Sequence, residues 1–425
     1  MSCCGMRPLG ESGVHPRGLL TPNHVALVNK VFPTEAGETG PRPSRLSTLV
    51  FYANQKPIKL AKVGEFLAKR IKGDLSRVKS GHVSVGLQIC DSLMVQCPPT
   101  HVNILAKSIM RIVDTVLQSP DPDLMLEATK TFVIFNSFYT HDTIIDVELT
   151  EQYSSLVFTF CAQCTYTTTD SIVQNKLHQS GLRAIQSISG NDTFFLNPRA
   201  ADYISKIIPA ILANLHEEGR LITTSPPPQK KGARAPIVPM RTTLTDDLFT
   251  HPLQQQSAIT SLGALLSNTN SKTLRMVLEP LWAEMDAKGE WRNDAHVAFI
   301  MDEIAAAVAP QYHYILLGSL VERVKVTALA SLDRRGVVVG LAVLVSGGNG
   351  SSVAAMELLE ALVGQIHEAS ARQEAENTSL QGALVEAVGA LAIHLAYPTQ
   401  LSDLVGFLVN RLVKEDAATR SILCS

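Results

Sequence analysis

The feature that most constrains the fold is a helical spacing of apolar residues, which recurs along the chain from about residue 57 onward. In His82–Cys97, for example, Val83, Leu87, Cys90 and Met94 would lie on one face of an α-helix. The same spacing predicts helices over about 101–118, 171–189, 199–216, 243–267, 272–286, 293–308, 313–331, 352–368, 377–395 and 398–414. No segment keeps the alternation of apolar and polar residues that is typical of a half-buried strand.

The length and number of these helices favour a repeat architecture. Aromatic residues are only 5% of the chain and charged residues 18%, which is typical of packed helices rich in Leu, Ala, Val and Ile. Many helices joined by short connections, without a sharp sequence repeat, predict an all-α fold, an elongated α-solenoid of armadillo/HEAT-like helical repeats. A closed all-α bundle is the alternative.

Proline and charge mark the expected domain boundaries. Residues 222–247 contain three consecutive prolines and a Lys-Lys-Gly-Ala-Arg run, so we expect a Pro-rich basic insert or linker there. The insert separates an N-terminal helical-repeat block (57–221) from a second helical-repeat block (248–425). Before residue 57, where the helical spacing begins, we expect a flexible N-terminal membrane-anchor segment (1–56). The last residues resemble an interrupted helix, so the second block is expected to be truncated.

No catalytic constellation stands out in the sequence. It contains no GxGxxG, P-loop, GxSxG or HExxH motif, so we predict no enzyme activity, catalytic residue, cofactor or metal. Cys161 and Cys164 have CxxC spacing without a second pair, which favours two thiols in a helix core over a zinc site. His141 and Asp142 are interpreted as surface residues. Seven scattered cysteines and the absence of an apolar leader indicate an intracellular protein.

Charge is unevenly distributed along the chain. Residues 1–80 hold 13 Lys/Arg and 5 Asp/Glu, a net charge of +8, whereas the other 345 residues hold 24 and 34, a net charge of −10. A basic end on an acidic body predicts an oriented contact with an anionic partner.

The basic residues are concentrated in Lys56–Lys79, where only Glu65 and Asp74 oppose them. An apolar stripe through this segment predicts a helix that packs on one side and presents cations elsewhere. We expect acidic phospholipids to contact Lys56, Lys59, Lys62, Lys69, Arg70 and Lys72. A solvated basic face is the alternative. Nucleic acid is not favoured as the partner, because no aromatic residues interleave the cations.

Two cysteines close to the start of the sequence suggest a lipid anchor. Cys3 and Cys4 lie beside Gly5. Palmitoylation of these thiols would strengthen membrane binding by about 0.8 kcal/mol for each CH₂ group that is buried in the bilayer. One acyl chain alone binds a bilayer only marginally, so acyl groups together with a basic surface form a plausible two-signal anchor. The alternative is two incidental thiols in a flexible tail.

Several of these segments, in this order and spacing, resemble the eighty-five-requiring (EFR) family. The motifs that carry the resemblance are Leu27-Val28, Val31-Phe32-Pro33, Leu49–Ala53, Lys59–Arg70, Asp74–Arg77, Gly81–Val83, His101–Leu105 and Lys206–Leu215. The resemblance implies an armadillo/HEAT-like rod attached peripherally to the cytoplasmic face of the plasma membrane. Cys3-Cys4-Gly5 matches the family's palmitoylated mode of attachment. The segment before Leu27-Val28 is richer in basic residues in relatives, whereas Asn23, Val25 and Ala26 of this chain are neutral.

The resemblance also implies partners. Family members recruit the type III phosphatidylinositol 4-kinase catalytic subunit through a tetratricopeptide-repeat adaptor, and so support phosphatidylinositol 4-phosphate synthesis at the plasma membrane. In the longer relatives the C-terminal part contacts the adaptor. The alternative for this chain is a soluble HEAT/armadillo-type adaptor in vesicle traffic or nuclear transport.

Overall fold

The computed structural model describes residues 22–34, 40–140, 146–215, 251–325, 331–349, 355–371, 375–393 and 398–414. All regular secondary structure in these ranges is helical, as the sequence predicts. The chain forms two compact units with their boundary between Ile112 and Val113. Cys3, Cys4, His141, Asp142 and the insert at 222–247 lie outside the described residues.

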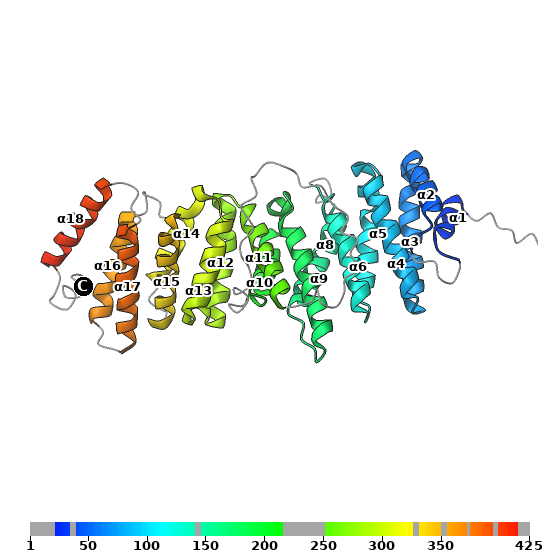
Figure 1. Cartoon of the computed structure of the whole chain (residues 1–425). Helices are drawn as coiled ribbons and strands as arrows, with labels where there is room; N and C mark the ends of the chain where they lie inside the picture. The colour runs from blue at the N-terminus through cyan, green and yellow to red at the C-terminus, as the bar shows by residue number, and fades with distance from the viewer. Residues whose placement is uncertain are drawn as a thin grey trace, which may run out of the picture. The chain divides into compact units, whose positions relative to one another are not determined.

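The first unit is built from helices that contact their sequence neighbours. Its elements are α1 (Asn23–Val31), α2 (Pro43–Gln55), the 3₁₀ turn η1 (Pro57–Lys59), α3 (Leu60–Ser76), α4 (Ser80–Gln96) and the first part of α5 (Pro99–Leu117). α1 packs against α2 and α3, and α4 packs against α2 and α3 (Figure 1).

Ordered structure begins earlier than the sequence predicts. We expected residues 1–56 to be flexible, but α1 and α2 lie within this range and contribute fully buried side chains. These are Val28, Val31, Leu49 and Ala53. The expectation was wrong for 23–31 and 43–55, because these short helices carry enough apolar residues to pack on their neighbours.

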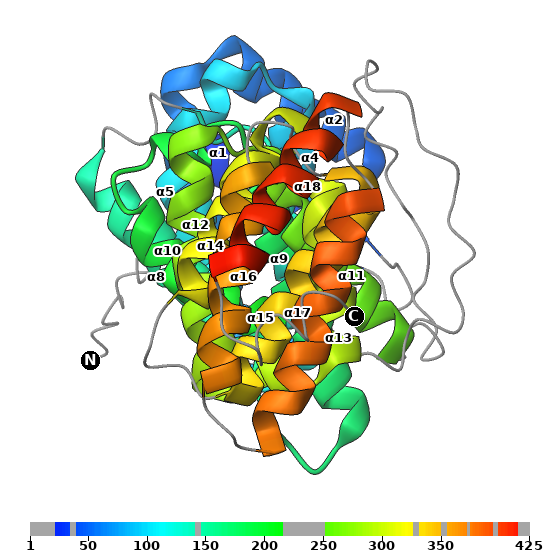
Figure 2. The same cartoon turned by 90° about the vertical axis from the view of Figure 1, so that its left-hand side faces the viewer.

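The second unit stacks its helices in two rows. Its elements are α6 (Pro122–Asn136), α8 (Val147–Cys164), α9 (Ser171–Ser189), η2 (Phe194–Leu196), α10 (Ala200–Leu212), α11 (His251–Ser267), α12 (Ser271–Lys288), η5 (Glu290–Arg292), α13 (Asp294–Ala307), η6 (Pro310–Tyr312), α14 (His313–Val324), α15 (Ser331–Leu344), the π-helical turn η7 (Val345–Asn349), α16 (Ala355–Ala371), α17 (Ala375–Ile393) and α18 (Pro398–Lys414). Contacts run through α8, α10, α12, α14 and α16 in one row and through α9, α11, α13, α15 and α17 in the other (Figure 2). This stacking is that of an α-solenoid.

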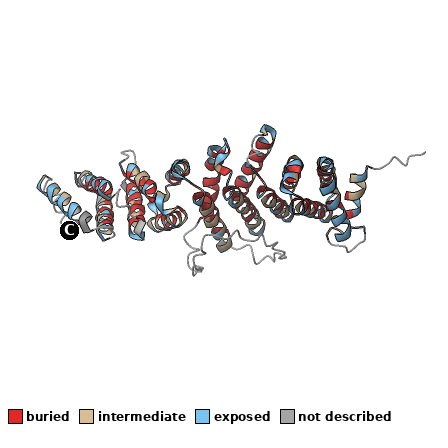
Figure 3. Cartoon of the chain, turned by 90° about the horizontal axis from the view of Figure 1, so that it is seen from above, coloured by how far each residue is buried: buried red, intermediate tan, exposed pale blue. Residues whose placement is uncertain are grey.

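Buried apolar faces lie between the stacked helices (Figure 3). Polar side chains inside this core link neighbouring helices. Asn136 of α6 accepts a 2.7 Å hydrogen bond from the Tyr153 hydroxyl of α8 and donates to the Ser187 carbonyl of α9 at 2.8 Å. Such paired buried groups fix how one helix sits on the next, because an unpaired group would be costly.

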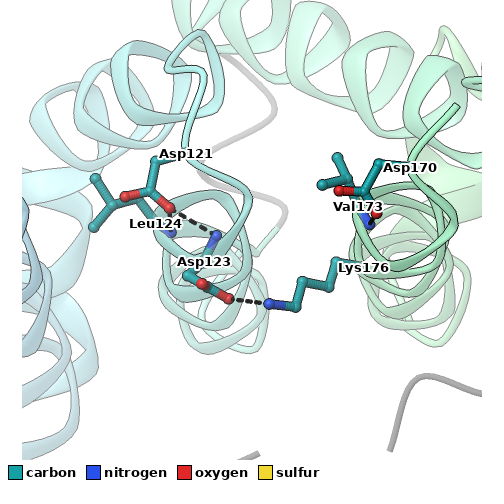
Figure 4. Close-up of polar contacts among 6 residues, drawn as sticks. All are labelled: Asp121, Asp123, Leu124, Asp170, Val173 and Lys176. Atoms are coloured by element: carbon teal, nitrogen blue, oxygen red, sulfur yellow. Dashed lines mark hydrogen bonds and ion pairs between the residues drawn. The ribbon is translucent and has the colours of Figure 1, made fainter. Parts of the chain in front are cut away.

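Aspartate side chains cap the first turns of α6, α8 and α9. In the Pro-Asp-Pro break before α6, the Asp121 carboxylate accepts from the backbone amides of Asp123 and Leu124. Asp170 caps α9 in the same way. Lys176 of α9 then forms a 2.9 Å ion pair with Asp123 of α6 (Figure 4).

Besides α1 and α2, the helices α8 and α15 were not among the predicted ranges. The apolar run over 337–345 belongs to α15 and the π-helical turn after it, and most of its residues are buried. Among the described residues no single helix is long and apolar enough to cross a bilayer. α13 together with the segment Pro310–Val324 meets the length and composition criteria only as a pair bent by 118°.

Candidate functional site

The structure places the predicted basic segment on α3 and the turn before it. α3 buries Leu60, Val63, Leu67 and Ile71 at helical spacing. Successive residues of an α-helix turn by about 100°, so the residues between these buried positions lie on the opposite face of α3. Several of them are exposed to solvent. That face carries exposed side chains of both signs, namely Lys62, Glu65, Lys69 and Lys72.

Two further lysines extend this face at the start of the helix. Lys56 and Lys59 flank and end the η1 turn, and both are exposed. Lys59 and Lys62 lie near His24 of α1. Burial lowers the pKa of His24, and the two positive charges lower it further. We call Lys56, Lys59, Lys62, Lys69 and Lys72 the lysine face.

The lysine face carries uncompensated charge. None of its five ammonium groups forms an ion pair with a described residue, although Lys56 lies 5.8 Å from the centre of the Tyr52 ring. Glu65 is the one acidic residue of the exposed α3 surface within the described chain. An array of unpaired cations of this kind attracts anionic surfaces.

Arg70 differs from the five lysines. Its guanidinium carbon lies 3.7 Å from the centre of the buried Phe32 ring, and its Nε is 3.5 Å from an Asp74 carboxylate oxygen. Nη1 donates to the Asn29 side-chain oxygen of α1. The side chain is only 23% exposed. Arg70 therefore joins α1 to α3, and we do not count it in the lysine face.

Sequence reasoning left two cations of the same segment out of the predicted site. Arg77 and Lys79 lie at the C-terminal end of α3 and are exposed. Neither forms an ion pair with another described residue. Both residues belong to the basic segment Lys56–Lys79, and this position in the sequence could have included them in the predicted site.

The other candidates do not form a chemical site. The thiols of Cys161 and Cys164 are buried in α8, as the helix-core interpretation predicts, and burial raises the pKa of Cys161 to about 12. In the part of the chain that the structure describes, no three His, Cys, Asp or Glu side chains are placed to hold a metal ion.

Comparison with known proteins identifies the family. A model of the EFR3 armadillo repeat matches residues 46–422. The chain belongs to the EFR3 armadillo-repeat family. Protein EFR3 homolog B of Mus musculus is 23% identical over 421 residues, which cover 93% of this chain and 49% of that protein. Protein EFR3 of Yarrowia lipolytica is 26% identical over 414 residues, covering 93% and 48%.

The chain thus spans about half the length of these EFR3 relatives. A solved structure described as the crystal structure of Efr3 superposes with a TM-score of 0.64 at 16% sequence identity, covering 95% of this chain and 70% of that one. At this identity the likeness concerns the fold, and it supports the helical solenoid. A helical-repeat scaffold fold of this family suggests a non-enzymatic role.

Proposed function

We propose that this EFR3-family chain is part of a peripheral scaffold at the cytoplasmic face of the plasma membrane. The observation that carries the proposal is the lysine face, five exposed cations on α3 and its preceding turn that form no ion pair with the residues the structure describes. These lysines would contact acidic phospholipids, and acyl groups on Cys3 and Cys4 would supply a second attachment.

The two signals complement one another energetically. Each cation close to an anionic leaflet contributes about 1 kcal/mol, and added salt weakens this contribution. A single acyl chain gives only marginal, reversible binding, so stable residence needs a second signal. Five lysines, offset in part by Glu65, would supply it.

Family membership supports a role in assembling other proteins. We propose that the chain helps to recruit a type III phosphatidylinositol 4-kinase catalytic subunit through a tetratricopeptide-repeat adaptor, and so supports phosphatidylinositol 4-phosphate synthesis. Stacked helices present long surfaces for such contacts. Co-precipitation of the adaptor and kinase with the tagged chain tests this part independently of membrane binding.

Vesicle sedimentation tests the electrostatic contact. We expect the Lys59→Glu/Lys62→Glu variant to bind vesicles of phosphatidylserine and phosphatidylcholine at least about tenfold more weakly than the unaltered chain. The matched control is Lys272→Glu/Arg275→Glu, which makes the same charge change at two exposed positions of α12. Equal loss in both variants would show that only net charge matters and would refute a specific lysine face.

Localisation tests the lipid anchor. A chain tagged at its C-terminus is expected at the cell cortex, and the Cys3→Ser/Cys4→Ser variant is expected to move largely to the cytosol. Unchanged cortical signal in the variant would refute acyl attachment at these cysteines. Diffuse or nuclear signal in both proteins would favour the soluble-adaptor alternative.

A further inference from the structure

Two apolar side chains at the ends of α3 are unusually exposed. Ile58 in the η1 turn and Val78 just after α3 are each 87% exposed, the highest values among the large apolar residues that the structure describes. Ile58 lies between Lys56 and Lys59, and Val78 lies between Arg77 and Lys79. Single exposed apolar residues are ordinary, but here both occur beside cations and at the two ends of one basic helix.

The backbone at Val78 adds a second observation. Its φ is +55°, in the left-handed region that β-branched residues rarely adopt, and it is the one non-glycine residue with positive φ in the described chain. The Val78 amide donates to the Leu75 carbonyl and the Lys79 amide donates to the Asp74 carbonyl, each at 3.0 Å. This is a Schellman ending, in which glycine is the usual residue at the left-handed position. A strained conformation therefore displays an apolar side chain where none is needed for packing.

We propose that Ile58 and Val78 insert into the bilayer at the level just below the lipid headgroups. The flanking cations Lys56, Lys59, Arg77 and Lys79 would remain at the phosphates. The proposal rests on the membrane contact proposed above and adds an apolar component to it. Because α3 has 17 residues, its ends lie about 25 Å apart, so the helix would lie along the membrane surface with the lysine face between the two insertions.

Charge complementarity selects a lipid surface as the occupant. A partner for this surface must accept cations and apolar side chains over the length of a whole helix, as an anionic bilayer interface does. By contrast Val147, which is 72% exposed at the start of α8, lies between Asp146 and Glu148. An anionic membrane would repel that position, so Val147→Ser is the matched control.

Vesicle binding of three single variants tests the insertion. Ile58→Ser and Val78→Gly are each expected to bind phosphatidylserine-containing vesicles about tenfold more weakly, whereas Val147→Ser should bind as the unaltered chain does. The loss should persist at high salt, because apolar insertion is not screened. Val78→Gly relieves the left-handed strain, so its Tm should stay the same or rise. A fall in Tm would indicate a structural role and contradict the proposal.

A fluorescent reporter places the side chain directly. The native Trp282 and Trp291 are buried, so they give a constant background. Tryptophan introduced by Ile58→Trp should shift its emission to the blue on vesicle addition and become quenched by brominated lipid. An unshifted spectrum with bound vesicles would overturn the insertion while leaving the lysine contact intact.

The remaining outcomes separate the two proposals. If the unaltered chain fails to bind anionic vesicles, both the membrane contact and the insertion are refuted. If binding depends on Lys59 and Lys62 but is unchanged in Ile58→Ser and Val78→Gly, only the insertion is refuted. Binding of an acidic polypeptide such as polyglutamate, with the same sensitivity to both apolar variants, would point to a protein partner and overturn the lipid assignment.

Discussion

At the scale of single residues, Arg70 separates fold from function within one basic run. Its contacts with Phe32, Asn29 and the buried Asp74 join α1 to α3, whereas the neighbouring Lys69 is exposed. We expect Arg70→Leu to lower the free energy of unfolding by about 2 kcal/mol, because it removes a cation–π contact and leaves Asp74 without its counter-charge. Urea denaturation measures this. Lys69→Leu is the control and should leave stability nearly unchanged. Equal midpoints for both variants would contradict the assignment.

His24 offers a second prediction at this scale. Burial and the charges of Lys62 and Lys59 hold its pKa below 6.5 in the free chain. Bound anionic lipid would offset the two lysine charges and raise this pKa toward the ordinary histidine value, so protonation should strengthen binding as pH falls below that value. The ratio of vesicle affinities of the unaltered chain and His24→Gln should therefore increase from about pH 7.5 to about pH 5.5. A ratio that stays constant over this range would show that lipid does not approach Lys59 and Lys62.

The same residue has the opposite effect on folding. A histidine with a lowered folded-state pKa binds its proton more readily in the unfolded chain, so its contribution to stability is present above pH 6.5 and is lost as pH falls below it. Binding and stability should thus move in opposite directions on acidification. Vesicle affinity and unfolding free energy, measured over the same pH series, therefore distinguish the effect of His24 on binding from its effect on folding.

At the scale of helices, the sequence predicts elements well where apolar spacing is undisturbed. The helices over 171–189 and 398–414 begin and end at the expected residues. α15 was missed because Gly336 and Gly340 interrupt its pattern. The structure explains one of them, since a Cβ at Gly336 would lie 1.9 Å from the Trp291 carbonyl oxygen. Close approach of two elements is a tertiary property that spacing alone does not reveal.

The candidate site was also only partly predictable at this scale. The run of lysines on one helix, and the apolar stripe opposite them, follow from the order of residues in Lys59–Lys72. The inward direction of Arg70 depends on Phe32 and Asn29 from another helix. The exposure of Val78 depends on how α3 ends. Neither could be obtained from residue type and spacing.

At the scale of the whole molecule, stability should be distributed locally. Each helix of the second unit contacts mainly its neighbours in the two rows, so the free energy of folding is approximately a sum of nearest-neighbour terms. Damage at one interface should then open the elements around it before it affects distant ones. The lysine face belongs to the first unit, so its binding should survive damage to the second.

Gly336→Ala tests this distribution. The added methyl group would collide with the Trp291 backbone, and we expect a loss of about 3 kcal/mol in unfolding free energy. Gly318→Ala in α14 meets nothing within 4 Å, so it should be neutral or stabilising by up to about 1 kcal/mol. Hydrogen exchange should show lost protection in α13, α15 and α17, with unchanged protection in α3 and unchanged vesicle binding. Lost protection in both units would instead mean that the chain unfolds as one cooperative body, and substitutions far from α3 would then weaken membrane binding through folding alone.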